Sequence, residues 1–193
     1  QNLAAIQALL SNINDINARN TYGETALMLA LKGIRHNSEL ATEITQQLIA
    51  AGADVNLADQ YGNASLYYAL QNSAPLALID ALLVKNADLN KKNNYGNDLT
   101  IWLPRQNLAV LKRLYTLQPD WLTENQHAEF LWPWVVNHPE REPLIAWLLA
   151  HGVNPNQTST QQTQLPMVLA LRAHAYELLE PLRQAGGHLQ KQT

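Results

Sequence analysis

The sequence predicts an all-α solenoid of stacked helix-turn-helix units, and two observations support this prediction. A phrase of Asp, one apolar residue and Asn, followed by Tyr-Gly, occurs at Asp15–Gly23, Asp54–Gly62 and Asp88–Gly96, with the Asp residues 39 and 34 residues apart. The intervals between these phrases also carry apolar patterns with helical spacing, such as Leu78, Ile79, Leu82 and Leu83. A period near 33 residues with two helices per unit is typical of a helical solenoid, in which each unit buries its apolar face against its neighbours.

The period predicts a single domain over residues 1–193. We expect it to consist of a half-repeat followed by five repeats, with these bounds: 1–19, then 20–58, 59–92, 93–124, 125–159 and 160–193. The repeat at 20–58 is longer than the others by a few residues near 33–37, between its two helices. Because a surface loop gains residues at little entropic cost, we expect an exposed bulge there.

Prolines and tryptophans mark the units that depart from the pattern. Pro104 predicts that the inner helix of the third repeat ends near Leu103, since proline removes a backbone hydrogen bond and clashes with the preceding turn. Pro181 predicts a last outer helix of about two turns. Four of the five Trp residues lie between Trp121 and Trp147. They are interpreted either as core that fills an irregular repeat, with Trp134 and Trp147 favoured, or as a binding surface.

Composition excludes several function classes. The net charge of −3 provides no field that would attract nucleic acid or an anionic membrane, and the short basic pairs Lys91-Lys92 and Lys112-Arg113 fall short of a phosphate-binding stripe. No apolar run approaches the length of a membrane span. The chain lacks Cys, its six His residues are scattered, and it has no P-loop, dinucleotide fingerprint or nucleophile elbow. We therefore expect no enzyme, no metal and no cofactor.

The repeat phrases resemble those of ankyrin-repeat proteins over essentially the whole chain. Thr25–Ala30 and Leu165–Ala170 are similar to the Thr-Pro-Leu-His-Leu-Ala phrase of that family. Leu48–Asn56 resembles the end of its second helix, with Gly52 at the C-cap position that needs a left-handed backbone. The resemblance implies short hairpin fingers between repeats and binding of protein partners through the finger tips and the concave face.

The candidate partner-binding residues follow from that resemblance and from register. Polar residues stand twelve positions after each turn opener and predict a concave row, although a solvated face explains them nearly as well: Lys32, Gln71, Arg105, Asn137 and Arg172. The finger candidates are Arg19, Thr21, Tyr22, Glu24, Gln60, Tyr61, Asn63, Lys92, Asn94, Tyr95, Asn97, Glu124, Gln126, His127 and Glu129.

Two sets of finger residues have alternative roles. The openers Asn20, Asp59 and Asn93 are expected to bond local backbone groups and hold the hairpin. The tyrosines that precede each glycine either anchor a partner or stack between repeats.

We expect a non-enzymatic protein-binding module, and one hypothesis is a bacterial immunity protein that neutralises a toxin. The alternatives are an ankyrin adaptor or effector, and a periplasmic stress-protection protein. Because the chain begins at Gln1, we expect a periplasmic location after signal removal slightly ahead of a cytoplasmic one.

Overall fold

The computed structural model describes residues 14–118, 128–158 and 164–190. This part of the chain is helical and contains no strand, apart from an isolated antiparallel bridge between Arg19 and Thr25. By packing, the chain divides into two compact units, residues 1–106 and 107–193. The division falls between the two helices of the repeat predicted at 93–124.

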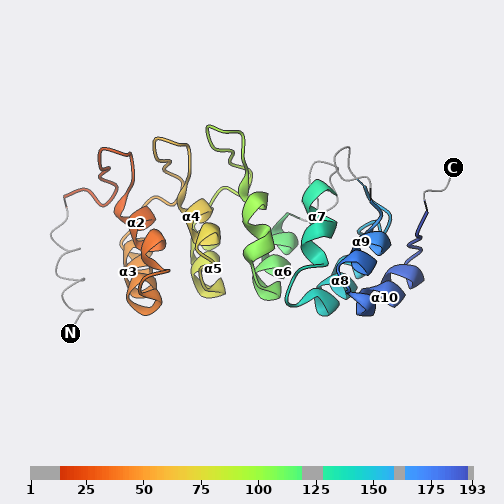
Figure 1. Ribbon diagram of the computed structural model, residues 1–193. Helices are drawn as coiled ribbons and strands as arrows, with labels where there is room; N and C mark the ends of the chain where they lie inside the picture. Colours follow the sequence, from red (N-terminus) through yellow and green to blue (C-terminus); the bar gives the residue numbers. More distant parts are fainter. Residues whose placement is uncertain (1–13, 119–127, 159–163, 191–193) are drawn as a thin grey trace. The chain divides into compact units, whose positions relative to one another are not determined.

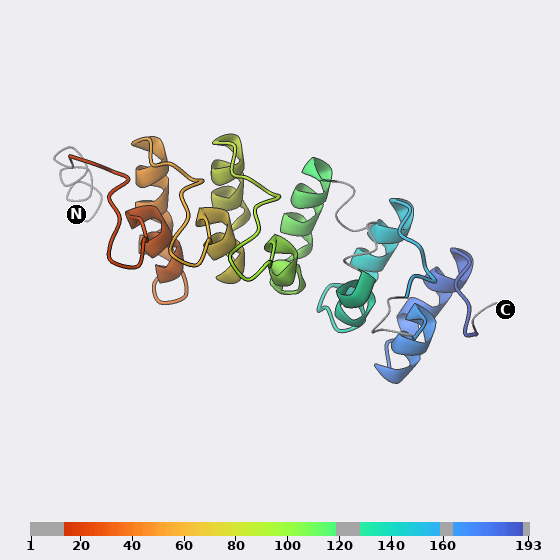
Figure 2. The ribbon, with the colours of Figure 1, turned by 90° about the horizontal axis from the view of Figure 1, so that it is seen from above.

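The described part of the first unit contains two helix pairs and a further single helix. The pairs are α2 (Ala26–Gly33) with α3 (Ser38–Ala50), and α4 (Ser65–Gln71) with α5 (Leu76–Val84); the 3₁₀-helix η1 (Leu99–Arg105) follows. Seen from above, the inner helices α2 and α4 form one row and the outer helices α3 and α5 a second row behind it (Figures 1 and 2). This two-layered stacking confirms the helix-turn-helix prediction.

Short polar side chains cap the start of α2 and α3, and left-handed residues follow the ends of the outer helices α3 and α5. Thr25 Oγ1 accepts from the backbone N–H of Met28, and Asn37 Oδ1 accepts from that of Leu40, so both act as N-caps. Gly52 has φ +91°, as its C-cap position predicted. Asn86, with φ +58°, takes the corresponding position after α5.

The core of the first unit lies between the two rows of helices. Leu27 and Leu31 of α2, Leu66 and Leu70 of α4, and Leu78, Ile79 and Leu82 of α5 are almost completely buried. These residues recur at helical spacing, so each helix buries one apolar stripe. Burial of this kind supplies most of the stability of a solenoid, since each unit covers the apolar face of the next.

The second unit repeats the same plan with less regular helices. Its elements are α6 (Leu108–Leu117), α7 (Ala128–Val135), α8 (Arg141–Ala150), α9 (Pro166–Arg172), η4 (Tyr176–Leu178) and α10 (Leu179–Gln184). Packing contacts join α7 to α8 and α9, and α10 to α8, η4 and α9.

The proline positions have the effects that proline chemistry predicts, with one difference. The last outer helix, which contains Pro181, has only six residues, as expected. The inner helix of the third repeat does not end at Leu103: it continues to Arg105, but as a 3₁₀-helix. Proline disrupts the i to i−4 hydrogen bonds of an α-helix. A 3₁₀-helix is built from i to i−3 bonds instead, so the chain can remain helical around Pro104 in this form.

The insertion in the first full repeat is exposed, as predicted. Arg35, His36 and Asn37 are solvent-exposed, whereas Ile34 is buried and anchors the segment to the core. None of the helices in the described ranges has the length and apolar character required to cross a bilayer.

Candidate protein-binding surface

Three hairpins, here called the fingers, comprise residues 19–24, 58–63 and 92–97, and they project on the same side of the first unit (Figure 1). The opener of each finger accepts two backbone N–H groups. Asn20 Oδ1 accepts from Tyr22 and Glu24, at 2.9 and 3.0 Å. Asp59 Oδ1 and Asn93 Oδ1 do the same two and four residues further on. The predicted role of the openers in holding the hairpin is confirmed.

The fingers are also hydrogen-bonded to one another. The backbone N–H of Gln60 donates to the carbonyl of Tyr22 at 3.0 Å, and that of Asn94 donates to the carbonyl of Tyr61 at 2.9 Å. Side chains add to this link, since Asn94 Nδ2 donates to the carbonyl of Gln60. The fingers are therefore fixed relative to one another by backbone bonds rather than by side-chain packing alone.

The tyrosine at the end of each finger remains exposed. Tyr22 is 58% exposed, Tyr61 45% and Tyr95 70%. The rings of Tyr61 and Tyr95 also stack, with centroids 6.3 Å apart and an interplanar angle of 23°. The Tyr61 and Tyr95 rings are therefore ordered by stacking on each other and remain exposed to a partner. Ordered aromatic rings suit a binding surface, because little conformational entropy is lost when they are covered.

The remaining finger candidates divide into exposed and buried groups. Those that are solvent-exposed are Arg19, Thr21, Gln60, Lys92, Asn94 and Asn97. Asn63 is only 8% exposed, and its Oδ1 accepts from Asn93 Nδ2 at 3.0 Å. The Asn63 side chain therefore joins two fingers rather than facing solvent.

Lys32, the first member of the predicted concave row, is part of an internal network. Its Nζ forms an ion pair with Glu24 and lies 4.4 Å from the centre of the Tyr68 ring. Tyr68 in turn donates its hydroxyl to Asp59. The hydrogen bond from Lys32, and then that from Asn20, lowers the pKa of the Glu24 carboxyl. Both charges are thus largely satisfied within the protein.

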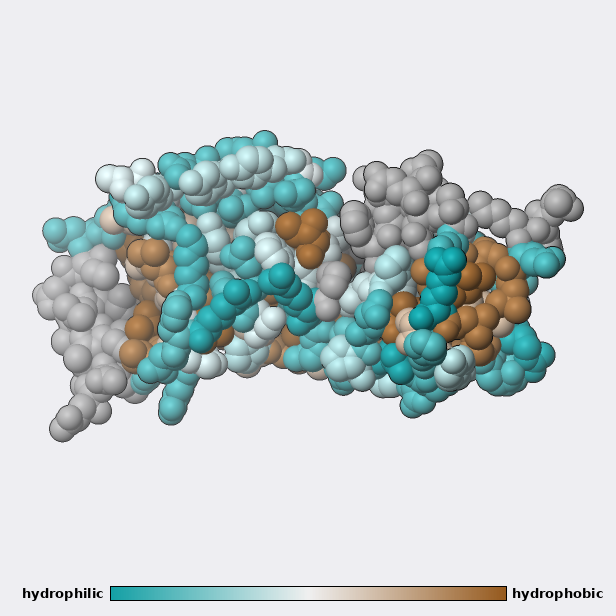
Figure 3. Space-filling view, viewed as in Figure 1, coloured by the Kyte–Doolittle hydropathy of each residue, from teal (hydrophilic) through white to brown (hydrophobic). Residues whose placement is uncertain are grey.

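The next members of the row are more open. Gln71 is half-buried, and Arg105 is exposed with its guanidinium 5.1 Å from the centre of the Trp102 ring. Trp102 packs edge-on against Tyr67, with centroids 5.5 Å apart. Arg105 is therefore a cation supported by an aromatic platform on the inner-helix side of the unit. In Figure 3 the finger side is hydrophilic, and apolar surface is confined to separate patches.

The candidates of the second unit are less completely described. Asn137 and Arg172 are exposed, and Asn137 Nδ2 donates to the carbonyl of Pro133 at 2.7 Å. Glu124, Gln126 and His127 lie outside the described residues. Glu129 belongs to the helix α7, but the structure does not describe its side chain.

The tryptophans of the second unit mostly serve packing. Trp132 is 1% exposed, and Trp134 is also buried. Trp147 is half-buried against Tyr115, with ring centroids 4.7 Å apart. The prediction that Trp134 belongs to the core is confirmed, whereas Trp132 is buried more deeply than Trp147. Trp121 lies outside the described residues.

Sequence reasoning missed the role of Asn56 and of its counterpart Asn156 in the second unit. Asn56 Oδ1 accepts from the backbone N–H of Asp88, and its Nδ2 donates to the carbonyl of Asn86. Asn156 makes the equivalent pair of bonds to the backbone of Gly186 and His188 within the second unit. The repetition of Asn at this position was the available signal.

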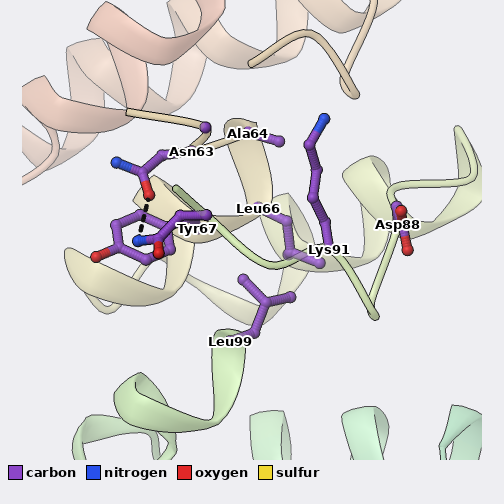
Figure 4. A pocket seen from close by; sticks show the side chains of 9 residues that line it. Asn63, Ala64, Leu66, Tyr67, Asp88, Lys91 and Leu99 are labelled. Atoms are coloured by element: carbon purple, nitrogen blue, oxygen red, sulfur yellow. Dashed lines mark hydrogen bonds between the residues drawn. The ribbon is translucent and has the colours of Figure 1, made fainter. Parts of the chain in front are cut away.

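Each unit contains a cavity, but neither has the features of a ligand site. One, of about 10 Å³, lies beside the second finger, where Leu66 and Leu99 approach each other and Lys91 runs along one side (Figure 4). That volume holds at most one water molecule. The other, in the second unit, has about 390 Å³ and is open and polar, with Arg141 already paired to Glu177. Within the described ranges, no group of three His, Cys, Asp or Glu side chains could hold a metal ion.

Stacked helical hairpins with linked fingers define a helical-repeat protein, and comparison with known proteins identifies the family. Residues 1–93 match the family described as ankyrin repeats (3 copies). An ankyrin repeat domain from Acinetobacter baumannii superposes with a TM-score of 0.74 at 25% identity, covering 97% of this chain and 94% of that one. Residues 1–93 therefore consist of ankyrin repeats, and the chain has the fold of an ankyrin repeat domain.

Two further comparisons extend this. A chain from the complex of a predatory endopeptidase of Bdellovibrio bacteriovorus with an immunity protein has a TM-score of 0.70 at 20% identity, covering 95% of this chain and 92% of that one. A mitochondrial disaggregase of Bos taurus is 34% identical over 93 residues, which are 48% of this chain and 12% of the disaggregase. Ankyrin repeats are protein-binding units, and the fold is typically non-enzymatic.

Proposed function

We propose that this protein is a binding module that engages a specific protein partner through the fingers and the inner-helix side of its first unit. The observation that carries the proposal is the set of exposed tyrosines on a backbone whose fingers are hydrogen-bonded to one another. Such a surface is already ordered before the partner arrives, so association loses less entropy than it would with a mobile loop. Asn137 and Arg172 hold the equivalent register positions within the second unit and remain candidate binding residues of that unit.

The experiment is a comparison of binding by wild-type protein and a Tyr61→Ala/Tyr95→Ala variant. The full chain serves as bait in affinity purification, and the affinity for the recovered partner is then measured by calorimetry. We expect the variant to lose more than about 1 kcal/mol of binding free energy, since exposed ordered tyrosines are typical binding anchors. Both side chains are exposed, Tyr61 to 45% and Tyr95 to 70%, and neither belongs to the core, so the midpoint of thermal unfolding should change little.

A matched control is available in Tyr176→Ala. Tyr176 is 58% exposed, but it lies in η4 of the second unit and bonds His174. Unchanged affinity in the double variant, or an equal loss in Tyr176→Ala, would contradict the proposed surface.

In its more specific form, the proposal is that the partner is a toxin or secreted enzyme and that binding confers immunity. The support is the shared fold with a chain of the endopeptidase–immunity protein complex, together with a binding surface of fixed geometry. Co-expression with the toxic protein recovered as partner should protect cells from killing, and the Tyr61→Ala/Tyr95→Ala variant should not. A tight complex with a harmless partner would refute the immunity role while leaving the binding function intact.

A further inference from the structure

We propose that the partner presents aspartate and glutamate side chains to the fingers of the first unit. This inference rests on the proposed function and adds the chemistry of the surface that is recognised. The inference follows from one difference within the fingers: their carboxylates are bonded inside the protein, whereas their cations are exposed to solvent.

The fingers contain two carboxylates, and both are occupied within the protein. Glu24 pairs with Lys32 and also accepts from Asn20 Nδ2. Asp59 is buried, accepts two backbone N–H groups with one oxygen and takes the Tyr68 hydroxyl with the other. Neither group is positioned to attract a cationic partner.

The two cations of the fingers are available instead. Arg19 and Lys92 are both exposed and occupy the same position, directly before the opener of the first and third fingers. The Nε of Arg19 donates to the carbonyl of Gly23 at 3.1 Å, which orients the guanidinium and leaves its terminal nitrogens without a protein partner in the described ranges. The Lys92 ammonium makes no ion pair or hydrogen bond to any described residue. The middle finger has Ala58 at this position.

Among the described residues, the acidic side chains that precede the fingers do not neutralise these cations. Asp15, Asp54 and Asp88 precede the fingers in sequence, and each accepts the backbone N–H of the residue two positions later. No ion pair joins them to Arg19 or Lys92 in the part of the chain that the structure describes. On the inner-helix side, Arg105 adds a third exposed cation beside Trp102.

Protein carboxylates fit this surface better than nucleic-acid phosphates do. Exposed cations flanking tyrosines form a small number of charge contacts around an aromatic centre, which is the composition of a protein interface. Nucleic-acid binding proteins neutralise many phosphates with a continuous basic stripe, whereas this chain has a net charge of −3. Complementary charge steers association and excludes wrong partners, so acidic partner residues would confer specificity.

The test uses the full chain as bait in a display selection from a library of random loops carried on a small folded scaffold. Clones that bind the bait are sequenced, and their affinities are measured for wild-type protein, for Arg19→Glu/Lys92→Glu and for Lys85→Glu. Lys85 is an exposed lysine at the C-cap of the outer helix α5 and serves as the matched control. Thermal unfolding of each variant verifies that the fold is retained, and a fluorescent DNA duplex is titrated in parallel.

We expect the selected loops to be enriched in Asp and Glu, and the double charge reversal to weaken their binding about tenfold or more at low salt, with little effect of Lys85→Glu. Selected loops that are neutral or basic, or that bind the double variant equally well, would overturn the inference while leaving protein binding in place. If the DNA duplex binds more tightly than the selected loops, and the double variant loses this binding, the inference would be wrong and the surface would bind nucleic acid. Failure to select any clone would count against the proposed function itself.

Discussion

Gly62 and Asn94 lie against each other at the junction of the second and third fingers. A Cβ atom added to Gly62 would lie 2.6 Å from Oδ1 of Asn94 and 2.9 Å from its backbone nitrogen. That nitrogen donates to the carbonyl of Tyr61, so the close approach coincides with the bond that joins the two fingers. The absence of a side chain at position 62 is therefore a condition for linking the fingers.

Replacing Gly62 by Ala should destabilise the first unit by more than about 2 kcal/mol, because backbone strain at positive φ adds to the steric conflict with Asn94. Gly52→Ala is the control: Gly52 also has a positive φ of +91°, no described atom lies within 4 Å of an added Cβ, and Asn86 carries a side chain at the equivalent position after α5. It should cost only about 1 kcal/mol of strain. Chemical denaturation compares the two variants, and equal losses would show that the approach to Asn94 has no energetic weight.

Asp59→Ala should lower the free energy of unfolding by about 3 kcal/mol, since it leaves two backbone donors and the buried Tyr68 hydroxyl without their acceptor. Asp54→Ala removes an exposed carboxylate that, among the described residues, accepts from one N–H group, that of Asn56. This control should cost below about 1 kcal/mol. Denaturant titration provides both values, and a small effect of Asp59→Ala would refute the assignment of Asp59 as the organiser of its finger.

Asn56→Ala should cost about 1–2 kcal/mol, because two hydrogen bonds to the next repeat are lost. The control is Asn154→Ala, because the Asn154 side chain also lies in such a turn but its described hydrogen bond is local, from the backbone N–H of Asn156. Asn154→Ala should cost below about 1 kcal/mol. Equal losses in the two variants would mean that local turn propensity, rather than the inter-repeat bonds, determines the cost.

The ion pair of Glu24 predicts a specific acid sensitivity. The pKa of Glu24 is lowered in the folded protein, so the pair contributes stability above the unfolded pKa of about 4.5 and loses it as the pH falls through the folded value. Wild-type protein should consequently be more stable than Glu24→Gln at neutral pH, and this difference should shrink at about pH 3. Thermal midpoints of both proteins across this range measure it, and a difference that is independent of pH would exclude the ion pair as its source.

The repeat architecture could be predicted from sequence because it depends on interactions between residues that are close together in the chain. The openers Asn20, Asp59 and Asn93 bond the backbone of their own turns, and Gly52 adopts the left-handed conformation that its position requires. Interactions within a few residues depend little on the rest of the fold, so the pattern alone identified them.

The surface was harder to predict, because polarity does not reveal which groups are already bonded. Lys32 and Arg105 occupy the same register position, yet Lys32 pairs with Glu24 whereas Arg105 lies exposed over Trp102. The bonds of Asn56 join residues about one repeat apart and depend on how neighbouring units stack. The continuation of η1 to Arg105 as a 3₁₀-helix was likewise not predicted, because the presence of Pro104 argues only against an α-helix at that point.

The hydrogen bonds between fingers determine which insertions and deletions such a chain can accommodate. Their donors and acceptors lie in adjacent repeats, for example Gln60 with Tyr22 and Asn94 with Tyr61. Gain or loss of a whole repeat would restore the same pairing, whereas a single residue inserted into a finger would misalign it. Evolution and engineering can therefore add or remove complete modules, while smaller insertions are confined to segments such as 33–37 that lie between the helices of one module.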